Sequence, residues 1–163
     1  MKNMLLALSA TLAFGSLAAP LALAQSGTHT SMANDHMMLT PGELKWVDIP
    51  SLPPGAKLAV IEGPLNQPGP ITFQLKLPAN YQIPAHWHPA IEHVTVISGT
   101  FNMGTGDKLD RAKTKALTAG SVAIMQPKTN HYGWTKDETI VQVHGMGPWG
   151  VTYVNPADDP RKQ

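Results

Sequence analysis

The sequence lacks cysteine and has few charged side chains. The absence of cysteine excludes disulfide bonds, thiolate ligands to a metal and cysteine nucleophiles. Charged residues make up 14% of the 163 residues, and the lysines between 108 and 115 are interleaved with aspartates. No basic patch stands out, so nucleic acid is not an expected partner. The sequence also lacks a glycine-rich phosphate loop, a nucleophile elbow and a zinc-protease motif.

Long apolar runs are missing as well, except at the N-terminus. There Lys2 is followed by an apolar or small stretch at 4–19 and by Ala-Leu-Ala at 22–24, as in a secretory signal peptide cleaved after Ala24. A permanent membrane anchor is the alternative, but Gly15 and Pro20 interrupt the run. No twin-arginine motif precedes it. We therefore expect export by the general secretory route to the periplasm or outside the cell, with no membrane association after cleavage.

Proline and glycine, in contrast, are abundant, with 15 and 14 residues. This favours short strands joined by turns over a helical bundle. Residues 25–40 are polar and without periodicity, and we interpret them as a flexible segment before a single domain at 41–163. The expected strands, with no long helices between them, indicate an all-β antiparallel sandwich or jelly roll. They lie at 44–49, 58–62, 71–77, 92–97, 100–103, 115–117, 121–125, 139–144 and 150–154.

Three polar residues near the middle of the chain have a spacing that is informative about function. His86 and His88 are two residues apart, so on a strand their side chains leave the same face. Glu92 begins the next expected strand and shares a face with the valines that follow, whereas His93 points to the opposite face. Imidazole nitrogens and a carboxylate on one valine-lined face predict a metal site.

The pattern His86-x-His88-x3-Glu92-x6-Gly99 resembles the first conserved motif of the cupin superfamily. A second segment, which ends at His131, is similar to the second motif of that superfamily in the separation of its glycine and histidine. The resemblance implies a single cupin-type jelly-roll barrel, also called a double-stranded β-helix, for the whole domain. The sequence resemblance itself covers the two motifs and the spacer between them.

The resemblance also implies that one divalent metal ion is bound by four side chains, namely His86, His88, Glu92 and His131. Three neutral nitrogens and one anionic oxygen suit Fe, Mn, Ni, Co, Cu or Zn. A six-coordinate ion would keep two positions open for substrate or dioxygen, whereas a four-coordinate zinc would be closed and structural. The chain departs from the two motifs at Asn80 and Lys128, which stand where glycine is usual.

Other residues around the expected site have two interpretations each. His144 and Gln142 share one face of a later strand and could face the pocket as hydrogen-bond donors or as a proton relay. An equally good interpretation of His144 is a core histidine whose ring nitrogens are hydrogen-bonded within the protein. Trp134 and Trp149 could wall a pocket for an apolar or aromatic ligand, or could simply pack in the core or at an edge.

Function has to be argued from this site, because one fold hosts many activities. We expect an exported metalloenzyme acting on a small organic molecule, with dioxygenase-like oxidation or cleavage as its first candidate reaction. A metal-dependent lyase or isomerase is the closest alternative, in which the ion polarises a carbonyl group and a nearby base moves a proton. A non-catalytic protein that binds a metal or a small ligand is a third hypothesis, and a structural protein with a closed zinc site is a fourth. The resemblance further implies a homodimer, with Trp87 and His93 on outward faces.

Overall fold

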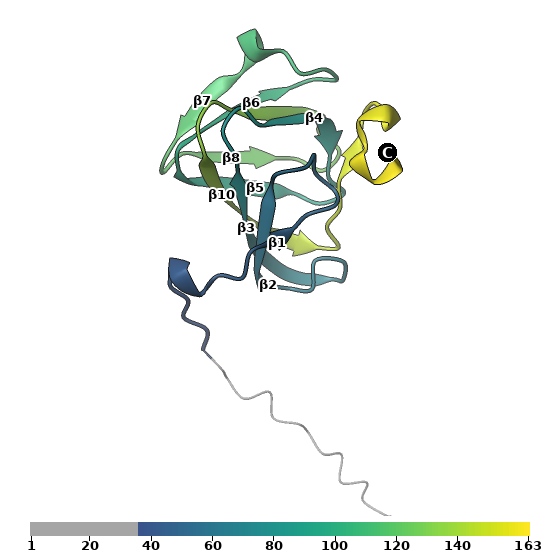
Figure 1. The fold of residues 1–163 in the computed structure, drawn as a ribbon. Helices are drawn as coiled ribbons and strands as arrows, with labels where there is room; N and C mark the ends of the chain where they lie inside the picture. The colour runs from purple at the N-terminus through teal and green to yellow at the C-terminus, as the bar shows by residue number, and fades with distance from the viewer. Residues whose placement is uncertain (1–35) are drawn as a thin grey trace, which may run out of the picture. The chain divides into compact units, whose positions relative to one another are not determined.

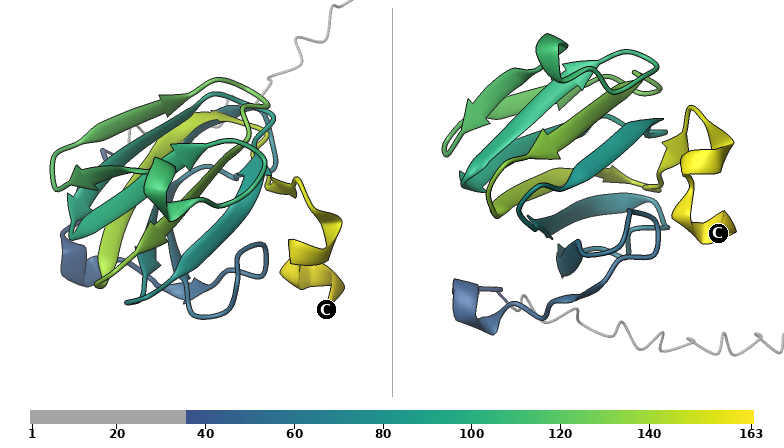
Figure 2. Two further views of the ribbon diagram at one scale, coloured as in Figure 1. Left: turned by 90° about the horizontal axis from the view of Figure 1, so that it is seen from above. Right: turned by 45° about the horizontal axis from the view of Figure 1, so that its top comes forward.

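The computed structural model describes residues 36–163, nearly half of which form two antiparallel β-sheets that pack face to face (Figures 1 and 2). The first sheet has six strands in the order β1-β2-β3-β10-β5-β8, and the second has five in the order β11-β4-β9-β6-β7. The predicted signal peptide and residues 25–35 of the predicted flexible segment lie outside the described residues. Within 36–163, no helix is long and apolar enough to cross a bilayer.

The strands of both sheets are short, and the chain passes repeatedly from one sheet to the other (Figure 2). The first sheet consists of β1 (Val47–Asp48), β2 (Lys57–Glu62), β3 (Gly69–Leu77), β10 (Thr139–Gly147), β5 (Glu92–Ser98) and β8 (Val122–Met125). The second consists of β11 (Thr152–Tyr153), β4 (Gln82–Trp87), β9 (His131–Thr135), β6 (Thr100–Thr105) and β7 (Lys115–Thr118). The helical segments are the 3-10 turns η1 (Pro41–Glu43), η2 (Arg111–Lys113), η3 (Pro156–Asp158) and η4 (Pro160–Lys162).

Alternate side chains of the central strands fill the space between the sheets. Val94 and Val96 of β5 lie opposite Val143 and Val141 of β10, and all four are buried. The residues between them point away from the core, as the period of two in a strand requires. This arrangement confirms the predicted all-β fold, a single jelly-roll barrel.

The hydrophobic pattern does not predict two of the strands, β4 and β9, which pair with each other. Pro84 lies within β4 and Gly133 within β9, and both residue types are depleted in strands. These two strands carry His86 and His131. Their pairing is therefore the part of the fold that matters most for the site.

The two positions that depart from the cupin motifs keep the backbone conformation that glycine would adopt. Asn80 has φ of 57° and Lys128 has φ of 60°, both in the left-handed region. The backbone N–H of Lys128 donates to the carbonyl oxygen of His88 at 2.9 Å, so this turn lies against the candidate metal ligands. Asparagine tolerates this region, whereas a lysine in it is strained.

Replacing Lys128 by glycine should therefore stabilise the protein. We expect Lys128→Gly to raise the free energy of unfolding by about 0.5–1 kcal/mol, because relief of left-handed strain outweighs the added freedom of the unfolded chain. Urea denaturation measures the change. Asn80→Gly is the matched control and should be nearly neutral, and a loss of stability in Lys128→Gly would show that the lysine side chain makes a contribution of its own.

Candidate metal centre

A register shift in the pairing of β4 with β9 aims His86 into the barrel. The shift lies between Ile83 and His86, and both side chains border the same internal cavity although they are three residues apart. A regular strand would place residues at an odd separation on opposite faces. Bulges of this kind often re-aim side chains next to functional sites.

The structure brings the four predicted ligands together from three neighbouring elements. His86 lies on β4, His88 directly follows that strand, Glu92 begins β5 and His131 begins β9. All four are 6% exposed or less. One ring nitrogen from each histidine lies within 4.8 Å of the others, close enough for one ion to contact all three. The carboxylate of Glu92 is next to them, with Oε1 3.5 Å from Nε2 of His88 and Oε2 3.2 Å from Nε2 of His131.

Backbone carbonyl groups fix which nitrogen of each histidine faces the centre. The Nδ1 atoms of His86 and His131 lie 2.7 Å and 2.8 Å from the carbonyl oxygens of Pro84 and Thr129. The Nδ1 atom of His88 lies 2.8 Å from the carbonyl oxygen of Gly150. A carbonyl oxygen only accepts, so each Nδ1 carries the proton and donates it to the bond. In the neutral form of each ring, Nε2 then has the lone pair that a metal ligand needs.

The pKa values of the four groups follow from their burial and mutual charges. Burial, together with the neighbouring His131 and His88, lowers the pKa of His86 to about 3 and keeps its ring neutral. Burial also lowers the pKa of His88, against the opposing influence of Glu92. Burial opposes charge on Glu92 and on His131, but their contact outweighs it: the pKa of Glu92 is lowered and that of His131 is raised. The contact therefore favours the charged form of each group, and a metal bound at Nε2 of His131 would take the place of a proton there.

Two buried atoms of the cluster have no hydrogen-bond partner among the described residues. They are Nε2 of His88 and Oε2 of Glu92, which meets His131 only as an ion pair. A buried polar atom without a partner is costly and calls for an explanation, such as an ion. Three imidazole nitrogens and one carboxylate form a donor set that suits a first-row transition metal. The residues therefore fit the divalent ion that the cupin resemblance implies.

The cluster lies at the side of an internal cavity of about 310 Å³. Trp149 borders this cavity, and its ring stacks on His88 with the centroids 4.0 Å apart and the planes at 19°. Phe73 meets Trp149 edge to face, with the centroids 5.8 Å apart. Trp149 thus walls the pocket and holds the ring of His88 in place. Trp134 does not border the cavity; its indole N–H donates to Oγ1 of Thr114 at 3.2 Å.

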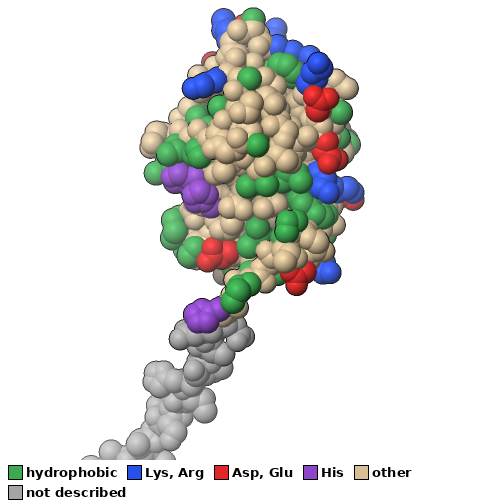
Figure 3. Space-filling model, turned by 90° about the vertical axis from the view of Figure 1, so that its left-hand side faces the viewer, with side chains coloured by type: hydrophobic (Ala, Val, Ile, Leu, Met, Phe, Trp, Pro, Cys, Tyr) green, Lys and Arg blue, Asp and Glu red, His purple; other side chains and the backbone are tan. Residues whose placement is uncertain are grey.

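The hypothesis that His144 and Gln142 face the pocket is wrong. The inward positions of β10 are taken by Val141 and Val143, so the alternate residues lie on the outer face of the sheet. There His144 stacks on His93, with ring centroids 4.8 Å apart; His144 is exposed and His93 is half-buried. Histidine and hydrophobic side chains lie side by side on one face of the molecule (Figure 3). Gln142 accepts a hydrogen bond from the side chain of Gln74 across the strands, at 3.2 Å. His93 points outward, as its strand position predicts.

Sequence patterns missed the carbonyl groups that orient the histidines. Two of them could have been found, since Pro84 and Thr129 each precede their histidine by two residues. The third, from Gly150, is 62 residues from its partner His88 and has no local signal.

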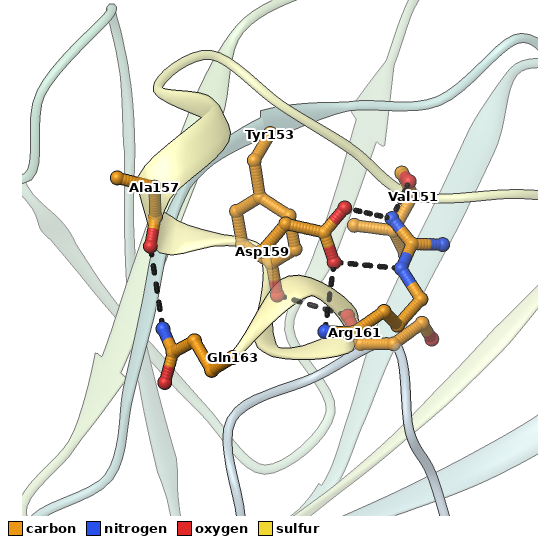
Figure 4. Close-up of polar contacts among 7 residues, drawn as sticks. Val151, Tyr153, Ala157, Asp159, Arg161 and Gln163 are labelled. Carbon is orange, nitrogen blue, oxygen red and sulfur yellow. Dashed lines mark hydrogen bonds and ion pairs between the residues drawn. The ribbon is translucent and has the colours of Figure 1, made fainter.

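The C-terminal segment lies beside the open end of the cavity and is held in place by its own polar contacts (Figure 4). Nε and Nη2 of Arg161 donate to the two carboxylate oxygens of Asp159 at 2.7 and 2.9 Å, and Nη2 also donates to the carbonyl oxygen of Val151 at 3.0 Å. The hydroxyl of Tyr153 donates to the carbonyl oxygen of Ser51 at 2.9 Å. The hydrogen bonds from Arg161 lower the pKa of Asp159, so the positive charge of Arg161 is neutralised within the segment.

Comparison with known proteins bears on the fold. No protein-family model matches the sequence, and no curated protein matches it significantly. The structure is similar to the polyketide cyclase RemF from Streptomyces resistomycificus, with a TM-score of 0.61 and 16% identity over 78% of this chain and 91% of that one. For a proposed acetylacetone dioxygenase from Methylibium petroleiphilum the TM-score is 0.57, with 15% identity over 77% and 85%. For an RmlC-like cupin from Shewanella frigidimarina it is 0.54, with 16% identity over 68% and 90%.

Proposed function

We propose that this chain, which has the double-stranded β-helix fold of the cupins, is an exported metal-dependent enzyme that oxidises or cleaves a small organic molecule with dioxygen. One observation carries the proposal: three inward-facing Nε2 atoms and one carboxylate converge at the side of an open, mostly apolar cavity. A closed structural zinc site would not need a cavity of about 310 Å³ beside it. The cavity gives a substrate direct access to the ion.

The residues of the chain have separate tasks in this proposal. His86, His88 and His131 hold the ion through Nε2, and their bonded Nδ1–H groups fix the ring orientations. Glu92 adds the one negative charge and partly neutralises the ion. The hydrocarbon walls exclude water from the reacting atoms. A redox-capable ion, when bound, supplies the chemistry of dioxygen activation and an anchoring point for an oxygen atom of the substrate.

Oxidation is favoured over the lyase or isomerase alternative because the described residues that border the cavity offer no free base apart from the four that would bind the ion. A proton-transfer enzyme needs a base within reach of the substrate, apart from the groups that bind the ion. His144, the candidate for that role, lies on the outer face. Among the described residues that border the cavity, Tyr132 donates its hydroxyl to the carbonyl oxygen of Asp110, and Arg161 is paired with Asp159.

The test is to strip the metal and to restore Fe(II), Mn(II), Ni(II), Co(II), Cu(II) and Zn(II) separately, followed by oxygen uptake and product analysis on a panel of small organic molecules. The proposal predicts turnover only with redox-capable ions and incorporation of labelled oxygen into the product. Equal turnover with zinc would move the assignment to a lyase or isomerase. No turnover with any ion, together with retained ligand binding, would favour the binding-protein hypothesis.

Export is tested by the N-terminus of the protein recovered from cells that produce the full chain. Cleavage after Ala24 should leave Gln25 as the first residue, in protein that is found outside the cytoplasm. Mass spectrometry of the intact protein measures this directly. Recovery of the uncleaved chain from the cytoplasm would contradict the prediction.

The homodimer also stays a prediction, and the outer face of the first sheet is its natural site. Ile97, Val122 and Ile124 are 46–56% exposed on β5 and β8, beside the stacked pair of His93 and His144 (Figure 3). Exposed apolar side chains of this kind are better explained by a partner surface. Light scattering at micromolar concentration should give twice the mass of the chain, and Val122→Asp should lower it. A monomer at every concentration would refute the dimer.

A further inference from the structure

The walls of the cavity are made almost entirely of hydrocarbon. The first sheet contributes Phe73 and Val143, the second contributes Ile83 and Phe101, and Leu52 adds to the wall from the loop after β1. These five side chains are 1–6% exposed, so they are core residues that leave space between them. A ligand in this space is therefore surrounded by apolar atoms, except on the side of the candidate metal centre and at the end lined by Asn66 and Arg161.

Few polar groups in the lining are free to bind a ligand. Arg161 borders the cavity, but both carboxylate oxygens of Asp159 already accept hydrogen bonds from its guanidinium group. The carbonyl oxygen of Ser51 accepts from the hydroxyl of Tyr153. Asn66 and Arg161 are exposed and so mark the open end of the cavity. A charged or polyhydroxylated ligand would therefore lose its hydration without gaining partners inside.

Resting on the proposed metal site, we propose that the substrate is a small apolar molecule, aromatic or branched, with one compact oxygen-bearing head. At the cavity, the buried side-chain atoms without a hydrogen-bond partner among the described residues are Nε2 of His88 and Oε2 of Glu92, which both belong to the ligand residues. The head therefore binds there and the apolar body fills the remaining space. The cavity of about 310 Å³ is roughly twice the size of one that holds a benzene molecule, which allows a body of one or two rings.

Trp149 determines how that body lies. Its ring stacks on His88 and meets Phe73 edge to face, so it forms an aromatic wall directly beside the candidate metal centre. Its backbone N–H donates to the carbonyl oxygen of Leu65, which also borders the cavity. The wall is therefore tied to the loop between β2 and β3. A flat ring attached to the oxygen-bearing head can pack against this wall.

The test measures binding rather than activity, with probes that share one metal-binding head. Calorimetry on zinc-loaded protein compares acetohydroxamate, benzohydroxamate and 4-carboxybenzohydroxamate. We expect benzohydroxamate to bind at least about tenfold more tightly than acetohydroxamate, because the ring is removed from water. The added carboxylate should weaken binding by at least about tenfold, because the inner walls are hydrocarbon and the charge of Arg161 at the open end is already paired with Asp159. Fluorobenzene, which has no head, should bind the metal-free protein as well, as measured by fluorine NMR.

The outcomes separate this inference from the proposed function. If the three hydroxamates bind only when metal is present but with equal affinity, or if the carboxylated probe binds best, the apolar substrate class is wrong and the metal site stands. If acetohydroxamate binding does not depend on metal, the proposed metal site fails. The binding of fluorobenzene to the metal-free protein then tests the apolar cavity independently. No binding of fluorobenzene up to its solubility limit would overturn the inference.

Discussion

Protein that carries His86→Ala should lose its metal. The Nε2 atom of His86 is one of the three inward-facing nitrogens, and its ring is held neutral by burial. Changes in groups that only orient a ligand typically weaken metal affinity by about 10–100-fold, so removal of the ligand itself should cost more than about 100-fold. We expect close to one ion per chain in the unaltered protein and less than about a tenth of that in the variant, by elemental analysis after dialysis.

The outer-face histidines provide a matched control for this variant. His93→Ala and His144→Ala each remove the same imidazole group from the stacked pair on the opposite side of the sheet. Both should keep the full metal content. Glu92→Gln keeps the size of the side chain but removes its charge, so it should weaken binding to a similar extent as His86→Ala. Normal metal content in His86→Ala, or loss of metal in His93→Ala, would contradict the assignment.

Removing the metal should lower the thermal stability of the protein by a large margin. A ligand present at a thousand times its dissociation constant stabilises the folded state by about 4 kcal/mol. For a domain of this size that corresponds to a drop in melting temperature of about 10–20 °C. The structure supplies the reason: without an ion, the Nε2 atom of His88 is buried without a hydrogen-bond partner among the described residues, and Oε2 of Glu92 meets only the ring of His131.

Calorimetric melting of protein with and without added metal measures this effect, and His86→Ala serves as the control. The variant should melt at the same temperature whether or not the metal is added. An equal rise in melting temperature for both proteins would mean that the ion acts at another place. No change in either protein would contradict a metal site that is coupled to folding.

The period of two in β5 was enough to predict the direction of its side chains. Glu92 and Val94 were expected on one face and His93 on the other, and the structure shows that arrangement. The same rule, applied to β10, would also have placed His144 correctly. Val141 and Val143 alternate with Gln142 and His144, and the apolar pair takes the core.

Other features of the site could not be predicted from local pattern. Strands β4 and β9 are interrupted by Pro84 and Gly133, so neither has a continuous strand pattern, and both are held by pairing with each other and with their neighbours. The shift that turns His86 inward depends on that pairing. The spacing of the motifs nevertheless pointed to His131. That prediction agrees with the structure because Lys128 keeps the left-handed turn that glycine would form.

The most direct test of the metal centre is a crystal structure of the metal-reconstituted protein, with anomalous diffraction recorded at the absorption edge of the ion. We expect one peak at about 2.0–2.2 Å from the Nε2 atoms of all three histidines and from an oxygen of Glu92. The Nδ1 atoms should keep their bonds to the carbonyl oxygens of Pro84, Thr129 and Gly150. A peak elsewhere, such as beside His93 and His144, or no peak between the histidines at full metal loading, would contradict it.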